Sequence, residues 1–195
     1  MKTTLGYNHS TSNSSVSEGQ RVVSSIGTTI ALVSFAMLFV TLMMGFAIFR
    51  FTAPVWPPQG ASKPALLIPS LSTLIIFLSS VAFNYFEKQP KERRKYFNVT
   101  ILMAVFFLIS QFLFWFNLHA NGIFTSSGVF ASILYSFTWI HAAHIVLAFF
   151  LLLWLAHKLE KSGIAPNQHL IKNIGLFWHF LGIVWLIMFV TIFVL

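Results

Sequence analysis

Two histidines stand three residues apart in the otherwise apolar stretch YSFTWIHAAHIVLAFF, which covers residues 135–150. On a helix, His141 and His144 would share one face. A third histidine, His179, lies in the last apolar stretch of the sequence. Imidazoles in apolar surroundings can bind a metal or haem, carry protons, or hydrogen-bond as neutral groups to a neighbouring helix or a bound lipid.

The residues around these histidines favour the third role. The chain has no cysteine and no aspartate, and its four glutamates are expected in a tail or in loops: Glu18, Glu87, Glu92 and Glu160. A haem shared by two helices needs facing histidines at matched depths, but His144 lies roughly 18 Å and His179 roughly 9 Å from the inner ends of their predicted helices. A proton pathway would need intramembrane carboxylates. We find no catalytic constellation, and metal ligation and proton transfer stay as alternatives.

The composition indicates an integral membrane protein of one domain. Charged residues make up 8% of the 195 positions, against roughly a quarter in soluble domains, and phenylalanine alone occurs 23 times. So few charges cannot cover a water-facing surface, and lipid must cover much of it. The formal net charge of +8 does not indicate a nucleic-acid partner, because the basic residues lie in short gaps between apolar stretches.

Five charge-free stretches are long enough to cross a bilayer as helices, which takes about 20 apolar residues. They cover residues 22–49, 64–86, 96–118, 127–156 and 173–195, with a turn expected at HANGIFTSSG. None shows the alternation of a membrane β-barrel, so the predicted fold is all-α, a polytopic membrane protein with five transmembrane helices in a single domain, 22–195. Residues 1–21 are rich in Ser, Thr and Asn and are expected to form a flexible tail.

The distribution of basic residues predicts the orientation in the membrane. One side of the predicted bundle carries only Arg50 and Lys63, and the other carries ten Lys and Arg residues: Lys2, Arg21, Lys88, Lys91, Arg93, Arg94, Lys95, Lys158, Lys161 and Lys172. The positive-inside rule therefore places the N-terminus in the cytoplasm and the C-terminus in the periplasm.

Aromatic and polar residues recur at helical spacing and predict helix packing. Trp178 and Trp185 share a face of the last span, and we assign them, with His141 and His179, a structural role. Trp56, in the turn after the first span, is expected near the membrane interface. A polar stripe runs along the second span: Ser72, Ser79, Ser80 and Asn84.

Four motifs follow one another in chain order: VWPPQG after the first span, RRKYF at the start of the third, the HxxH pair of the fourth and FWHFLGIVWL in the fifth. Together they resemble subunit III of the haem–copper terminal oxidases, the cytochrome c oxidase and quinol oxidase family. The resemblance runs from about residue 25 to the C-terminus and is to the short, five-helix bacterial form.

The resemblance implies a non-catalytic subunit without a cofactor of its own, in a respiratory complex of the bacterial inner membrane. Its implied partners are subunit I, which holds haem and copper, reduces oxygen and moves protons, then subunit II, further respiratory subunits and phospholipid. The implied role is to stabilise subunit I. Family members hold lipid headgroups partly with the second histidine of the pair and a basic residue at the end of the same helix, and these positions correspond to His144 and Lys158.

The sequence departs from the family at two acidic positions. Phe35 follows Ser34 where many members have a glutamate, and the last span has Leu181 and Gly182 where many have valine and aspartate. Because the roles of those acids do not transfer, we favour a scaffold over a proton relay. Two alternatives stay open: a subunit III paralogue of another haem–copper enzyme, such as nitric oxide reductase, and a small multipass transporter, although transporters usually show broken helices at mid-membrane.

Overall fold

The computed structural model describes residues 9–54, 66–161 and 168–194. The described residues form five long helices joined by turns: α1 (His9–Thr52), α2 (Leu67–Lys88), η1 (Pro90–Glu92), α3 (Arg93–Ala120), η2 (Thr125–Ser127), α4 (Val129–Lys161), α5 (Gln168–Phe189) and the π-helical η3 (Val190–Val194). Each of the five contains a stretch long and apolar enough to cross a membrane. The prediction of an all-α, polytopic membrane protein with five spans is confirmed.

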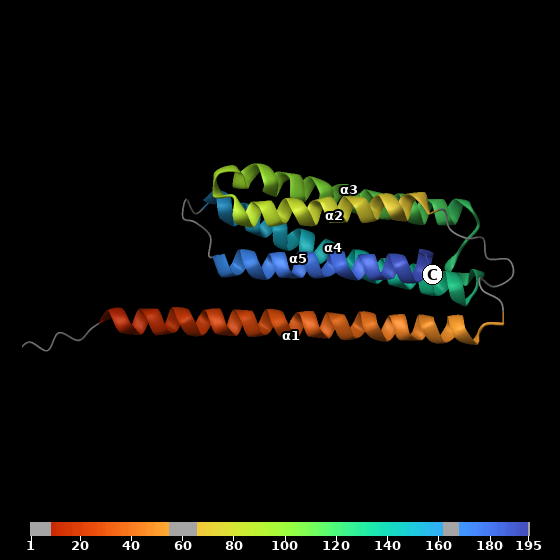
Figure 1. The fold of residues 1–195 in the computed structure, drawn as a ribbon, viewed down its shortest axis with the longest axis horizontal. Coiled ribbons are helices and arrows are strands. Elements are labelled where there is room, and N and C mark those ends of the chain that lie inside the picture. Colours follow the sequence, from red (N-terminus) through yellow and green to blue (C-terminus); the bar gives the residue numbers. More distant parts are fainter. Residues whose placement is uncertain (1–8, 55–65, 162–167, 195) are drawn as a thin grey trace, which may run out of the picture.

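Helices α2 to α5 form a bundle, and α1 lies along its side (Figure 1). In the bundle α2 packs against α3 and α5, and α4 also packs against α3 and α5, so the four helices close into a ring. Helix α1 packs on α5 and reaches α4 through aromatic contacts. Successive helices run in opposite directions, so the end of α2, the start of α3, the end of α4 and the start of α5 meet at one end of the bundle.

The helices extend beyond the charge-free stretches. Helix α1 begins at His9, inside the segment expected as a tail, and α4 continues to Lys161. A stretch without charged residues marks only the part of a helix that lies in the hydrocarbon of the bilayer. The backbone hydrogen bonds of the helix continue into the polar region, where Lys and Arg side chains can extend toward water. Between α3 and α4 the chain turns at Gly122 and Gly128, whose φ angles of 71° and 127° favour glycine.

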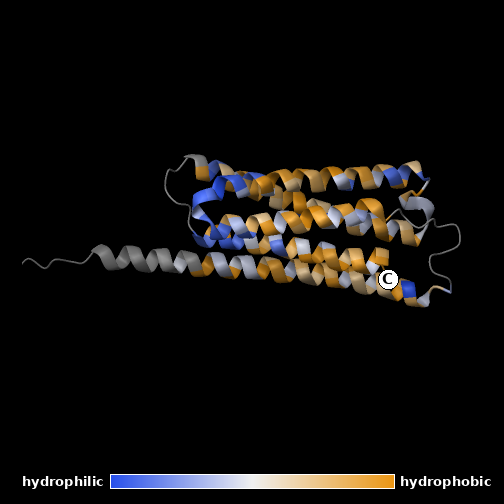
Figure 2. Cartoon of the chain, turned by 45° about the horizontal axis from the view of Figure 1, so that its top comes forward, coloured by the Kyte–Doolittle hydropathy of each residue, from blue (hydrophilic) through white to orange (hydrophobic). Residues whose placement is uncertain are grey.

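Apolar residues dominate the middle of the helices, and hydrophilic residues gather where α2 joins α3 and where α4 ends (Figure 2). Large apolar side chains on the outer faces are exposed, including Met44 at 65% and Phe77 at 63%. Such outward apolar surface is what a lipid environment requires of a membrane helix.

Polar side chains inside the bundle link neighbouring helices. Ser72 of α2 hydrogen-bonds to the hydroxyl of Ser110 of α3 at 2.8 Å. The Ser79 hydroxyl donates to the carbonyl oxygen of Thr100 at 3.3 Å. The predicted polar stripe on α2 therefore contacts α3 at these two positions, as expected of helix packing, whereas Asn84 is exposed.

Candidate functional site

The histidine pair of α4 lies at the junction of α1, α3, α4 and α5. His141 is completely buried, and its ring is surrounded by Phe39 of α1 at 6.0 Å, Phe107 of α3 at 6.0 Å and Trp185 of α5 at 5.2 Å, measured between centroids. Neither of its ring nitrogens has a hydrogen-bond partner among the described residues. The imidazole of His141 therefore serves as a packing ring among aromatic side chains of three other helices.

His144 faces α1, one turn away from His141. Its Nδ1 donates to the carbonyl oxygen of Ile140 at 2.7 Å, within its own helix. Its ring packs edge-on against Phe35 at 4.5 Å and lies 5.5 Å from Phe39. Phe39 thus contacts both histidines, so the structure brings His141 and His144 together on one face, as the spacing predicted.

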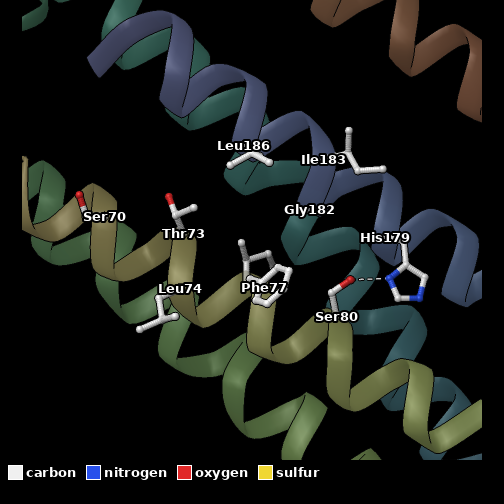
Figure 3. A pocket seen from close by; sticks show the side chains of 10 residues that line it. Ser70, Thr73, Leu74, Phe77, Ser80, His179, Gly182, Ile183 and Leu186 are labelled. Atoms are coloured by element: carbon white, nitrogen blue, oxygen red, sulfur yellow. Dashed lines mark hydrogen bonds between the residues drawn. The ribbon is translucent and has the colours of Figure 1, made fainter. Parts of the chain in front are cut away.

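His179 belongs to a different environment, between α5 and α2. Its Nδ1 hydrogen-bonds to the hydroxyl of Ser80, and Figure 3 shows the two side chains pointing toward each other across the helix pair. They line a groove of about 540 Å³ between α2 and α5, whose wall is mainly apolar and includes Phe77 and Leu186. The three membrane histidines therefore do not converge on one point.

The two tryptophans of α5 are core residues. Trp178 and Trp185 are each 1% exposed. The indole Nε1 of Trp185 donates to Thr73 Oγ1 of α2 at 3.0 Å, whereas Trp178 Nε1 has no partner among the described residues. Both side chains are buried in the bundle, and their structural role stays a prediction.

Gln111 is a buried polar residue that sequence reasoning missed. It lies on α3 at 1% exposure, and neither of its amide atoms has a hydrogen-bond partner among the described residues. The signal that could have found it is helical spacing, because Gln111 follows Phe107 by one turn on the face that contacts His141.

Candidate ligand sets for a metal are absent from the described part of the chain. No group of three or more His, Cys, Asp or Glu side chains there is arranged to hold a metal ion. What the histidines can do chemically is hydrogen-bond and pack: the structure shows one bond within α4 and one between α5 and α2.

The proposed lipid contact at the end of α4 involves a separate region. Lys158 is exposed, and its Nζ lies 5.0 Å from the centroid of the Trp154 ring, in a cation–π arrangement. Fourteen residues separate His144 from Lys158, about 21 Å along the helix axis. One headgroup cannot touch both side chains. Trp56 lies outside the described residues.

Comparison with known proteins identifies the family of this five-helix chain. A family model described as cytochrome c oxidase subunit III matches residues 4–195. The chain belongs to this family. The resemblance seen in the four motifs, to subunit III of the haem–copper oxidases, is therefore confirmed.

Curated relatives in this subunit III family are similar over most of the chain. Cytochrome c oxidase subunit 3 of Synechocystis sp. is 26% identical over 176 residues, which cover 87% of this chain and 74% of the relative. The protein of the same name from Thermostichus vulcanus is 27% identical over 180 residues, 87% of this chain and 86% of the relative. The mouse protein is 26% identical over 145 residues, 71% and 54% of the two chains.

Within this member of the subunit III family, the expectation that every glutamate lies in a tail or loop is wrong. Glu18 and Glu160 are helix residues of α1 and α4, and Glu87 lies in the last turn of α2. Glu87 is half-buried beside Gly175 of α5. The prediction failed because charged residues were used to end each span.

Proposed function

We propose that this chain is the non-catalytic subunit III of an aerobic haem–copper oxidase and that it stabilises subunit I. The observation that carries the proposal is the subunit III family model, which matches residues 4–195. In this proposal haem and copper are held by subunit I and subunit II, and electron transfer to oxygen and proton translocation take place there. The chain then contributes packing surface and lipid contacts.

The side chains of α4 and α5 support a scaffold role. The cage around His141 is built from aromatic rings of three other helices, and the polar groups of His144 and His179 are used in hydrogen bonds that hold helix geometry. The apolar faces of α1 and α2 remain exposed and are suited to lipid or to the helices of a partner subunit.

We further propose that the chain lies in a bacterial inner membrane with its N-terminus in the cytoplasm. The support is the ratio of basic residues, ten on one side and two on the other. The hydrophilic end of the bundle, where α2 joins α3, would then face the cytoplasm (Figure 2). Tagging each terminus and testing its access to a membrane-impermeant reagent in intact cells measures this orientation.

A phospholipid is proposed to contact both His144 and Lys158. Because the two side chains are about 21 Å apart along α4, the lipid would lie along the helix with its headgroup at Lys158 and an acyl chain toward His144. A lysine offers a single point charge to the phosphate, in contrast to the bidentate contact of an arginine. This is a separate proposal from the oxidase role and can fail without it.

The oxidase role is tested by purifying the tagged chain from its native membrane in a mild detergent. The preparation is examined by a reduced-minus-oxidised visible spectrum, by haem and copper analysis and by identification of co-purifying subunits. We expect haem bands, copper and a large partner subunit. Haem without copper, together with nitric oxide reduction, would instead assign the chain to a nitric oxide reductase. A colourless, homogeneous preparation from gently solubilised membranes would contradict both and favour a transporter.

A further inference from the structure

The groove between α2 and α5 has the dimensions of a single hydrocarbon chain. Its lining residues on α2 run from Ser70 to Ser80, a distance of about 15 Å along the helix axis. With a volume of about 540 Å³, the groove has a mean cross-section of about 35 Å², which corresponds to a width of roughly 7 Å. A helix with its side chains is about 10–12 Å across. The groove is therefore too narrow for the body of a partner helix.

The groove also has the depth of one membrane leaflet. Ser70 lies three residues after Leu67, where α2 begins, and Ser80 lies close to the middle of the helix. The hydrocarbon core of a bilayer is about 30 Å thick, so one leaflet contributes about 15 Å. The groove therefore runs from one surface of the membrane to its middle, which is the path of an acyl chain.

The hydroxyl groups that line the groove are already hydrogen-bonded to the protein. Ser70 and Thr73 each donate to the carbonyl oxygen four residues earlier in the chain, at 2.7 and 2.8 Å. The hydroxyl of Ser80 is paired with Nδ1 of His179. An apolar occupant would therefore leave none of these hydroxyl groups without a partner, so the groove suits a hydrocarbon chain in spite of its polar residues.

Gly182 gives the groove its open floor. A Cβ added there would meet only Ile76 Cγ1, at 3.9 Å, so the space above the glycine is free of other side chains. Large apolar side chains of both helices form the walls, including Phe77 of α2 and Leu186 of α5 (Figure 3). A chain in the groove would contact two helices at once and would gain more dispersion contacts than on the convex face of a single helix.

We propose that this groove binds one acyl chain of a phospholipid from the leaflet at the start of α2. None of the described residues that line the groove is Lys, Arg, Asp or Glu, so the charge of the headgroup should not affect binding. The site differs from the proposed contact at His144 and Lys158, because neither residue lines it. It also does not depend on the oxidase role, since any membrane supplies such a chain.

The test uses the full-length chain in a mild detergent and counts retained lipids by native mass spectrometry. The probes are phosphatidylcholine and phosphatidylglycerol with the same oleoyl chains, and dihexanoyl phosphatidylcholine, whose chains are too short to fill the groove. Gly182→Leu fills the groove and should remove one retained long-chain lipid, whichever headgroup it carries. It should not change the retention of the dihexanoyl lipid.

Gly45→Leu on α1 is the matched control. An added Cβ there meets nothing within 4 Å, and Gly45 does not line the groove, so this variant should retain as many lipids as the unsubstituted chain. Leu186→Ala keeps the space but removes part of one wall, and it should weaken retention in the same direction as Gly182→Leu. Circular dichroism establishes that each variant is folded, and Leu186→Ala replaces Gly182→Leu if the latter is not.

Three results of the lipid count would overturn the proposal: unchanged retention in Gly182→Leu, an equal loss in Gly45→Leu, or a loss confined to phosphatidylglycerol. Photo-crosslinking from position 183 in the native membrane separates the remaining occupants, because Ile183 lines the groove. We expect the crosslink to form to a phospholipid. A crosslink to a protein would assign the groove to a partner subunit and would also overturn the proposal.

Discussion

The packing of α2 against α5 predicts that two glycines of α5 respond oppositely to the same substitution. A Cβ added to Gly175 would overlap the edge of the Phe83 ring and lie 2.6 Å from Glu87 Oε1. The carboxylate can move aside, but Phe83 is completely buried, with the rings of Phe86 and His179 at 5.2 and 5.9 Å. A Cβ on Gly182 would meet only Ile76 Cγ1, at an ordinary 3.9 Å.

The two substitutions Gly175→Ala and Gly182→Ala form a matched pair. Each gains about 1 kcal/mol of helix propensity, and only the first adds an overpacking cost, typically about 1–3 kcal/mol. The difference between the two variants therefore isolates the clash, because the propensity gain cancels. For a chain of this size it corresponds to a melting temperature roughly 2–12 °C lower for Gly175→Ala than for Gly182→Ala.

Thermal unfolding of both purified variants in one detergent, followed by circular dichroism, measures this difference. The unsubstituted chain, run alongside, gives the sign of each effect. If Gly175→Ala melts at or above the temperature of Gly182→Ala, then α2 and α5 do not approach each other as described, and the reasoning fails.

Three further predictions follow from the core. Trp185→Phe removes the hydrogen bond from the indole to Thr73 and should lower the free energy of unfolding by about 1 kcal/mol beyond the effect of the smaller side chain. A double-mutant cycle with Thr73→Val measures the energy of this bond, and strictly additive effects of the two substitutions would contradict the prediction. His141→Leu removes a buried imidazole with no partner among the described residues, so stability should hold or rise, whereas a loss above roughly 2 kcal/mol would reveal a bonded imidazole. Chelation with EDTA should leave the melting temperature of the purified chain unchanged; a fall would reveal a bound metal.

The histidines show how far sequence reasoning carries for the candidate site. The bond from His144 to Ile140 spans four residues within one helix, so local geometry suffices to allow it. The partner of His179 is Ser80, 99 residues away, and depends on how α2 and α5 face each other. Helical spacing places both residues on stripes, but it does not say which stripe meets which.

Glu87 is a residue whose position the sequence reasoning predicted wrongly. A charged residue was used to end the second span, and this excluded the half-buried carboxylate in the last turn of α2 from the membrane region. The position beside Gly175 exists because glycine leaves room on the facing helix. That room is a property of two helices together and has no signal in either one alone.

The sequence by itself determined the number of membrane spans, the all-α class and the subunit III family. Length and apolarity are enough for the spans and the class, because each transmembrane helix satisfies its own backbone hydrogen bonds and needs no partner to be recognised. The family rests instead on four motifs that follow one another in chain order. Only the tertiary structure decided which faces meet, as in the cage around His141 and the groove between α2 and α5. In lipid every apolar face is equally acceptable to the solvent, so the choice among faces rests on shape complementarity and a few polar contacts between helices.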